Sequence, residues 1–329
     1  MAKSTTTVVF VHGMGKHDQT FHEEAWNFLA TKHKDLTGSD LDATPVPFVY
    51  DDLFEAMRTH PAGALKDLRP WVHDTGVLEA IKEIQSSGDF IYTHALDVLM
   101  WRFHPTIRAL IVTRLATALM PYIQSLTETS GNLVIVAHSL GTSVMTEVIH
   151  FIGTRAVPGY ARIPALHMLA DVAKVLECEV PAYDPPNPSL CRPYLQTPED
   201  SPAMLLHYFN YRNVLDPFPL VDLFDPGWPE SVYHETAFRA WGDPVQPHDI
   251  LTYVAAPEVH MKLLRSITRD GKTYTKKREN EAIQASQTVS TSGQPRQELF
   301  QRLADRFRDK TSVDGFVKLC RAAADMGLW

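Results

Sequence analysis

The sequence is poor in cysteine and has no N-terminal run of apolar residues. Among its 329 residues are three cysteines, Cys178, Cys191 and Cys320. An odd number without motif spacing argues against a disulfide framework and favours a reducing compartment, although a Cys178–Cys191 bridge stays open. The first residues, M-A-K-S-T-T-T, contain no apolar signal region, and we therefore expect a cytoplasmic location.

Positive charge is also scarce overall. The net charge is −8 and the sequence pI is about 6.0, which argues against nucleic acid as a partner. Residues 262–329 differ, with 14 Lys and Arg against 8 Asp and Glu. We interpret this segment as a solvated basic surface, and a docking surface for an acidic partner is the alternative.

Apolar residues recur at helical spacing between Leu96 and Leu115, but Arg102, Arg108 and Arg114 interrupt them. Such a stretch is too charged to span a membrane. We expect a pair of core-facing helices there, and the alternative is a mobile cap over a site. Membrane or lipid contact is therefore a minor alternative.

What the sequence does contain is an alternation of short apolar runs and helical segments, which predicts an α/β fold with a mostly parallel sheet and helices on both faces. The predicted strands are 7–11, 46–50, 133–136, 163–169 and 205–214, with 232–238 as a further strand-like run. The predicted helices are 21–33, 142–151, 258–264 and 296–309.

The expected organisation is one α/β domain over residues 1–264, with a C-terminal extension over 265–329 that is basic and partly helical. Residues 53–126 are expected to form a helical insertion broken by four prolines, Pro61, Pro70, Pro105 and Pro121. Two segments are expected to form loops: the proline-rich segment 181–202 and the polar segment 273–294.

The stretch V-I-V-A-H-S-L-G-T-S-V places Ser139 between a predicted strand and a predicted helix. A sharp strand-to-helix turn can push a serine hydroxyl into a cleft, but it requires small residues two before and two after the serine. Ala137 and Gly141 occupy these places, and the methyl group of Ala137 is expected to press on the turn. The N–H of Leu140, at the helix N-terminus, would face a developing oxyanion. The alternative is that Ser139 merely caps the helix.

A second motif, H-G-M-G, follows the first predicted strand and comprises His12, Gly13, Met14 and Gly15. A glycine-rich loop in this place can supply the second oxyanion donor, for which we expect the Met14 N–H. A phosphate loop and a dinucleotide fingerprint fit poorly, because Lys16 is followed by His17 and the third glycine slot holds Asp18. Nor do the histidines have metal-ligand spacing, so neither metal nor cofactor is expected.

The A-H-S-L-G elbow, with His138 before the serine, and the H-G-M-G loop together resemble those of α/β-hydrolases of the serine esterase and lipase type, over about residues 7–264. The resemblance implies an α/β-hydrolase fold and a Ser-acid-His triad in that chain order.

For the acid we expect Asp216, which ends a strong strand before Pro217, with three alternatives, Asp184, Asp222 and Asp225. For the base we expect His248, on a late loop before the last helix. His234 is expected in a strand and His260 in a helix, and the side chain of His138 is expected to point away.

The resulting expectation is an enzyme, a carboxylic ester hydrolase that forms an acyl-enzyme on a small-molecule ester. A lipase is its nearest variant, and a thioesterase or amidase would use the same triad. A non-catalytic interaction protein that kept the fold is the alternative from another class. Oligomeric state is left open.

Overall fold

A computed structural model describes residues 6–59, 70–72, 89–128, 131–155, 162–176, 205–220, 230–240 and 246–287, together with a few isolated positions. Four predicted features lie outside these residues: the loop at 181–202, the helix at 296–309, the three cysteines, and the alternative acids Asp184, Asp222 and Asp225.

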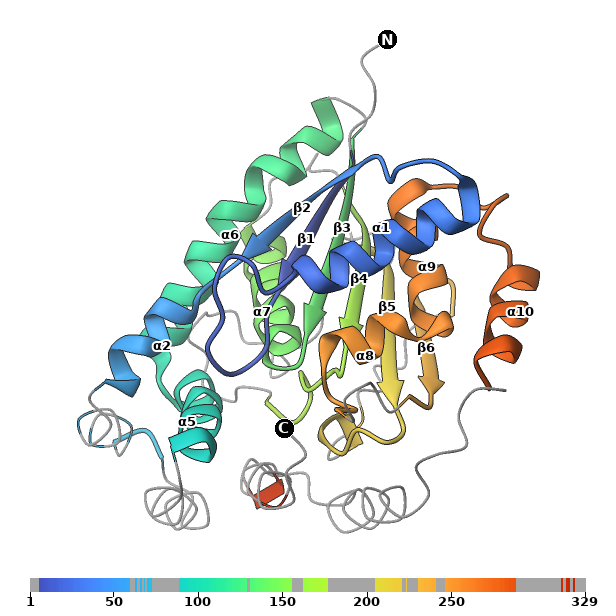
Figure 1. The fold of residues 1–329 in the computed structure, drawn as a ribbon. Coiled ribbons are helices and arrows are strands. Elements are labelled where there is room, and N and C mark those ends of the chain that lie inside the picture. Colours follow the sequence, from blue (N-terminus) through green and yellow to red (C-terminus); the bar gives the residue numbers. More distant parts are fainter. Residues whose placement is uncertain are drawn as a thin grey trace.

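The described residues form a six-stranded, all-parallel sheet with the strand order β2-β1-β3-β4-β5-β6 (Figure 1). The strands are β1 Thr6–Val11, β2 Ala43–Phe48, β3 Asn132–His138, β4 Ile163–Leu169, β5 Leu205–Asn213 and β6 Tyr233–Phe238. Each predicted strand is present, and the predicted α/β class with a parallel sheet is confirmed.

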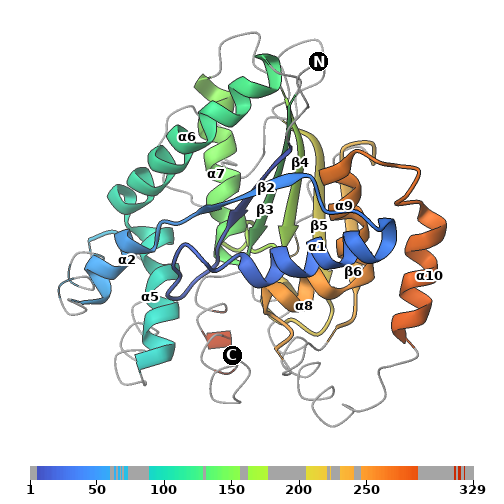
Figure 2. The same ribbon diagram turned by 45° about the horizontal axis from the view of Figure 1, so that its top comes forward.

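Helices cover both faces of this sheet (Figures 1 and 2). On one face lie α1 Glu23–Thr37, α8 Ile250–Ala255 and α9 Pro257–Thr268, and on the other α6 Pro105–Glu128 and α7 Leu140–Arg155. Two further helices, α2 Asp51–Arg58 and α5 Asp89–Phe103, lie together at the β2 end of the sheet, and α10 Lys276–Gln287 packs on α9.

This two-sided cover explains why the central strands are continuously apolar. Along β1, Val9 and Val11 belong to the core on the α6–α7 face, whereas Val8 and Phe10 belong to the core on the α1–α9 face. All four side chains are fully buried. A strand buried on both faces has no polar side to alternate with, and that is the pattern from which β1 and β3 were predicted.

Prolines in the chain act according to position. Pro45 and Pro47 lie within β2, which is an edge strand of the described sheet, and an edge strand tolerates proline. Pro105 begins α6, where a helix tolerates proline. The predicted break at Pro121 is wrong, because α6 continues through it. Pro121 and Thr117 are both exposed, so water can solvate the carbonyl that loses its partner.

The polar segment 273–294 was predicted to be a loop, and this is wrong for its first part, which forms α10. The Thr275 hydroxyl accepts a hydrogen bond from the Arg278 N–H and so caps the helix. Glu279 is buried and lies 3.4 Å from the Lys262 ammonium and 3.7 Å from the Arg265 guanidinium, both on α9. Tertiary ion pairs therefore hold a helix whose own composition is poorly amphipathic.

Residue 264, the expected domain limit, lies inside α9, which continues to Thr268. Within the expected helical insertion, α6 packs against α7 and β3 and is therefore part of the core. By length and composition α6 could also cross a membrane, with a mean hydropathy of 1.3 in its most apolar window. Among the described residues, α6 is the one helix that meets these criteria. The core helices of soluble proteins can meet the same criteria.

Buried histidines make the fold sensitive to acid. Burial lowers the pKa of His12 and of His167 to about 3, and that of His260 to about 4. Unfolding restores ordinary pKa values near 6.5, so the unfolded chain binds protons that the folded chain does not. Folding stability is therefore lost as the pH falls below about 6.5.

We predict that His167→Gln flattens this pH dependence. His167 is fully buried, and its ring nitrogens contact the Tyr211 and Ser266 hydroxyls at 2.9 and 3.0 Å. We expect the free energy of unfolding to fall less steeply in the variant than in the wild type, measured by urea denaturation between about pH 6 and pH 4. The difference in slope should be about 1.4 kcal/mol per pH unit, which corresponds to one proton. Thr113→Ala, at an exposed residue of α6 that carries no titratable group, is the control and should keep the wild-type slope. Equal slopes in both variants would show that His167 does not contribute to the loss of stability in acid.

Candidate active site

Ser139 lies at the carboxyl end of β3, in the turn that leads directly into α7. Its φ is 52°, a left-handed conformation that non-glycine residues rarely adopt. Its N–H donates to the Leu169 carbonyl of β4 at 2.9 Å, and its carbonyl accepts from the Thr142 N–H at 2.8 Å. The surrounding backbone thus holds the strained conformation, and strain maintained in this way is typical of functional sites.

The strand order reverses beside this serine. The chain runs outward from β1 to β2 and then returns to β3 on the other side of β1. The loops after β1 and β3 therefore diverge at the carboxyl edge of the sheet, and ligands of open α/β sheets bind at such a point.

Glycines allow the two loops to approach closely. A Cβ at Gly13 would lie 2.9 Å from the Ser139 Cβ. A Cβ at Gly141 would overlap the His12 carbonyl oxygen and lie 2.8 Å from that of Val11. Ala137, by contrast, is a regular, fully buried residue of β3, in register with Val11 and Met168. Between these two loops, the close approach is thus made at Gly13 and Gly141.

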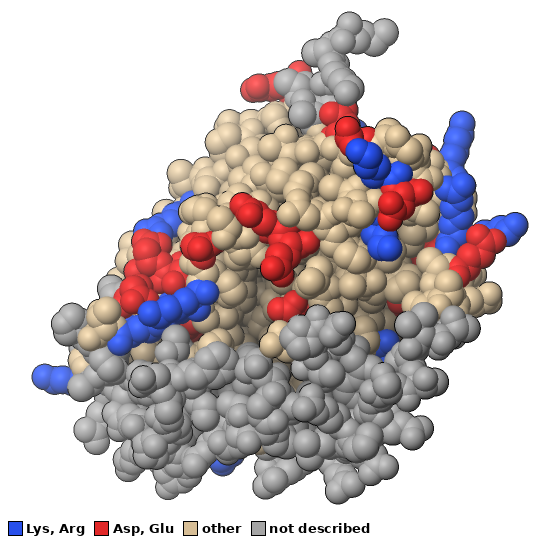
Figure 3. Space-filling model, viewed as in Figure 1, with Lys and Arg blue, Asp and Glu red and all other residues tan. Residues whose placement is uncertain are grey.

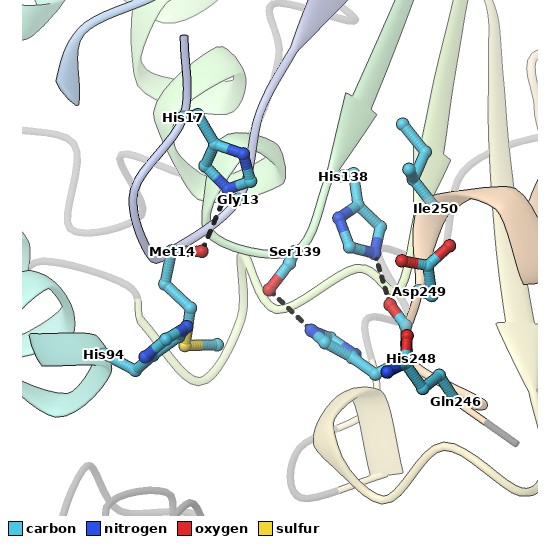
Figure 4. Close-up of a pocket in the computed structure, with 10 residues that line it drawn as sticks. All are labelled: Gly13, Met14, His17, His94, His138, Ser139, Gln246, His248, Asp249 and Ile250. Atoms are coloured by element: carbon cyan, nitrogen blue, oxygen red, sulfur yellow. Dashed lines mark hydrogen bonds between the residues drawn. The ribbon is translucent and has the colours of Figure 1, made fainter. Parts of the chain in front are cut away.

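Ser139, His248 and Asp216 form one chain of hydrogen bonds. The Ser139 Oγ lies 2.8 Å from His248 Nε2, and His248 Nδ1 lies 2.7 Å from Asp216 Oδ2 (Figure 4). The three predicted residues, separated by up to 109 positions, are therefore brought together in the predicted order of contact. Because its hydroxyl binds His248, Ser139 does not act as the side-chain cap of α7.

The Asp216 carboxylate is fully buried and its other bonds are also satisfied. The Tyr253 hydroxyl donates to Oδ2 at 2.7 Å, and the Phe218 N–H donates to Oδ1 at 3.0 Å. Burial, together with the charge of Asp216, raises the pKa of Tyr253 well above its usual value, so that the phenol remains a donor. Tyr253 was not predicted, since a tyrosine in α8 carries no motif.

His248 lies in the loop that leads from β6 to α8. The carboxylate of the next residue, Asp249, caps α8 by accepting from the Leu251 N–H at 2.7 Å. The His248 carbonyl accepts a hydrogen bond from His138 Nε2 at 2.7 Å (Figure 4). Burial, followed by the neighbouring His248, lowers the pKa of His138 well below its ordinary value, so His138 is a neutral donor.

The expectation that His138 points away from the site is therefore wrong. Its ring lines the cleft and fixes the backbone that carries His248, although the base nearest to Ser139 is His248. The other two histidines lie as predicted. His234 is in β6, 3.1 Å from a ring nitrogen of His207, and His260 is buried in α9.

The two expected oxyanion donors flank Ser139. Leu140 is the first residue of α7, where N–H groups have no partner within the helix. Met14 lies between Gly13, which packs on Ser139, and Gly15. Within the described part of the chain, no residue accepts a hydrogen bond from the N–H of Met14 or of Leu140.

The remainder of the H-G-M-G loop is fixed by histidines. His12 donates through Nδ1 to the Gly13 carbonyl at 2.8 Å and accepts from the Tyr50 N–H at 3.2 Å through Nε2. His17 donates through Nε2 to the Met14 carbonyl at 3.1 Å. Burial lowers the pKa of both rings, so both act as neutral donors. His12 is thus a structural part of the motif.

A cleft of about 220 Å³ opens beside the Ser139 hydroxyl (Figure 4). Among the described residues, its lining combines four histidines with polar and apolar side chains and contains no lysine or arginine. The lining residues are Gly13, Met14, His17, His94, His138, Ser139, Gln246, His248, Asp249 and Ile250. His94, on α5, was not predicted as part of the site. Among the described residues, no group of three or more His, Cys, Asp and Glu could hold a metal ion.

Comparisons with protein-family models, with curated proteins and with solved structures find no match to the chain.

We predict that Gly141→Ala destabilises the protein by about 1–3 kcal/mol, because the added methyl group overlaps the backbone of the loop after β1. Gly271→Ala is the matched control, since no heavy atom lies within 4 Å of a Cβ placed there. Urea denaturation measures both variants. A Gly141→Ala protein as stable as Gly271→Ala would show that the two loops are farther apart than described.

Proposed function

We propose that the protein is a serine hydrolase of the α/β-hydrolase fold that cleaves carboxylic esters through an acyl-enzyme. The observation that carries the proposal is the hydrogen-bond chain Ser139–His248–Asp216, with its serine on a strained turn at the carboxyl edge of a parallel sheet. The order of the three residues supports the proposed fold. In this chain they follow β3, β5 and β6 in turn, and the order serine, acid, histidine is the chain order of the α/β-hydrolase fold.

The first half of the reaction forms the acyl-enzyme. His248 Nε2 takes the proton from Ser139 Oγ as the oxygen attacks the ester carbonyl carbon. Asp216 accepts the hydrogen bond from Nδ1 and stabilises the imidazolium ion. The negative charge on the former carbonyl oxygen is bound by the N–H groups of Met14 and Leu140, each worth roughly 3 kcal/mol in the transition state. His248 then returns the proton to the departing alcohol.

The second half repeats these steps with water as the nucleophile. His248 removes a proton from the water, the water oxygen attacks the acyl carbon, and Ser139 leaves with the proton. Products are the carboxylic acid and the free enzyme. A thioester or an amide can pass through the same steps, and an ester is proposed because the A-H-S-L-G and H-G-M-G motifs resemble those of serine esterases and lipases.

We predict that Ser139→Ala lowers hydrolysis of p-nitrophenyl acetate at least about 1,000-fold and abolishes covalent labelling by a fluorophosphonate. The control is Ser143→Ala, one turn further along α7, whose buried hydroxyl accepts from Trp101 Nε1 at 2.8 Å. It should keep both activities. Hydrolysis retained by folded Ser139→Ala protein would overturn the proposed nucleophile, and a wild-type protein that is neither active nor labelled would favour a non-catalytic interaction protein.

A second prediction concerns the acid. Asp216→Asn should lower kcat/KM for the same ester by about 10⁴-fold, because an amide nitrogen facing Nδ1 favours the wrong imidazole tautomer. Asp171→Asn is the control, a buried carboxylate after the neighbouring strand β4 that binds the Tyr208 hydroxyl at 2.6 Å. Thermal melting should show both variants folded. A larger loss in Asp171→Asn than in Asp216→Asn would mean that another acid orients the base.

A further inference from the structure

A buried guanidinium and a buried carboxylate hold both backbone groups of Gly15. The Gly15 N–H donates to Asp97 Oδ2 at 2.9 Å, and the Gly15 carbonyl accepts from Arg58 NH2 at 3.0 Å. Gly15 has a φ of 101°, which non-glycine residues rarely adopt, so the chain bends here under constraint.

Arg58 and Asp97 also bind each other in the two-bond geometry that arginine and carboxylate favour. Arg58 Nε lies 2.9 Å from Asp97 Oδ1, and NH2 lies 2.6 Å from Oδ2. Asp51 adds two further bonds to Arg58, at 3.0 and 2.8 Å, and the Glu55 carboxylate lies 3.4 Å from Arg58 NH1. The side chains of Arg58 and Asp97 are 4% and 1% exposed.

Burying such a pair is costly, and it rarely contributes much to net stability. Burial raises the pKa of Asp97 to about 6. Because this pKa still lies below neutral pH, the carboxyl group is ionised there and pairs with Arg58. With three carboxylates around it, from Asp51, Glu55 and Asp97, Arg58 adds no net positive charge to the neighbouring cleft. Its contribution to a reaction there is therefore the geometry of the loop and not its charge.

The Gly15 N–H belongs to the same peptide unit as the Met14 carbonyl. Asp97 therefore holds one side of this unit and His17 the other, through its bond to the Met14 carbonyl. On the preceding side, Gly13 packs against Ser139. Met14 is thus constrained from both directions, and its own N–H remains without a described acceptor.

We propose that Arg58 and Asp97 are positioning residues that hold the loop after β1 in the shape that directs the Met14 N–H to the oxyanion. This inference rests on the proposed function. It gives α2 and α5, from the segment expected to be a helical insertion, a direct part in the site, because α5 carries both Asp97 and the cleft-lining His94.

The test is Asp97→Asn in the full chain, because the amide offers one acceptor oxygen in place of two. Either Arg58 Nε, which binds Oδ1, or the Gly15 N–H and Arg58 NH2, which bind Oδ2, then lose their acceptor. We expect kcat for p-nitrophenyl acetate to fall about 10- to 100-fold, with KM changed less than about 3-fold, since the loop binds the transition state more than the substrate. Affinity for a trifluoromethyl ketone, whose adduct carries an oxyanion, should fall with kcat.

The matched control is Asp52→Asn on α2, the helix that carries Arg58. Asp52 pairs with Arg114 of α6 at 2.6 Å, and both side chains are exposed. Figure 3 shows charges of both signs adjoining on the surface over α2. This variant removes an ion pair without touching the loop, so kcat should stay within about 2-fold of the wild type. A loss in Asp52→Asn equal to that in Asp97→Asn would overturn the positioning role.

A double variant separates positioning from folding. Arg58→Met with Asp97→Leu removes both charges and fills their space, and thermal melting shows whether this variant, in which Asp51 loses its partner, is folded. A folded double variant with reduced kcat supports the proposal, and one with wild-type kcat overturns it.

Hydrogen exchange keeps this inference distinct from the proposed function. In a peptide covering residues 13–17, amide exchange should rise in the double variant, where the Gly15 N–H loses its acceptor, and not in Asp52→Asn. Unchanged exchange would show that Arg58 and Asp97 do not hold the loop after β1, even in an active enzyme. A wild-type protein without hydrolysis or labelling would instead disprove the proposed function and, with it, the catalytic consequence of holding this loop.

Discussion

The backbone turn at Ser139 is the constraint on which the rest of the site depends. A left-handed residue between β3 and α7 projects the serine hydroxyl from the carboxyl edge of the sheet, and the cost of that conformation must be met by its surroundings. The turn is held by β4 through the Leu169 carbonyl and by α7 through Thr142. It also requires that the loop after β1 come within contact distance, which only Gly13 and Gly141 permit.

Around this turn, neutral donors and buried acceptors fix each part of the site separately. Tyr253 holds the acid, His138 holds the backbone of the base, and His17 holds the Met14 carbonyl. The imidazoles can serve in this way because burial lowers their pKa and keeps them uncharged. In the proposed hydrolase, an arrangement of this kind would be organised before substrate binds, and such preorganisation supplies much of the electrostatic catalysis of enzymes.

The parts of the site that could be predicted from sequence were those with a local signature. Ser139 and Gly141 follow one apolar run, and Gly13 follows another. The expected chain order then pointed to Asp216 and His248, and the structure brings both into one chain of hydrogen bonds with Ser139. Their catalytic roles remain predictions. Strands buried on both faces were also predictable, since their continuous apolar runs leave few alternatives.

What could not be predicted depends on contacts between distant elements. Tyr253 and Asp97 lie on helices without a motif, and only the packing of those helices brings them to Asp216 and Gly15. The helix at α10 depends on ion pairs of Glu279 with α9, and α6 tolerates Pro121 because that side of the helix is exposed. In each case tertiary surroundings outweighed local propensity.

The proposed acyl-enzyme can be detected directly. The protein is mixed with p-nitrophenyl acetate, quenched in acid within the first turnover, digested, and mapped by mass spectrometry. We predict one acetyl group on the peptide that contains Ser139, assigned by fragmentation to that residue, and a burst of p-nitrophenolate equal to the enzyme concentration. Hydrolysis at a measurable rate with acetyl groups on another residue, or with none on Ser139, would contradict the proposed nucleophile.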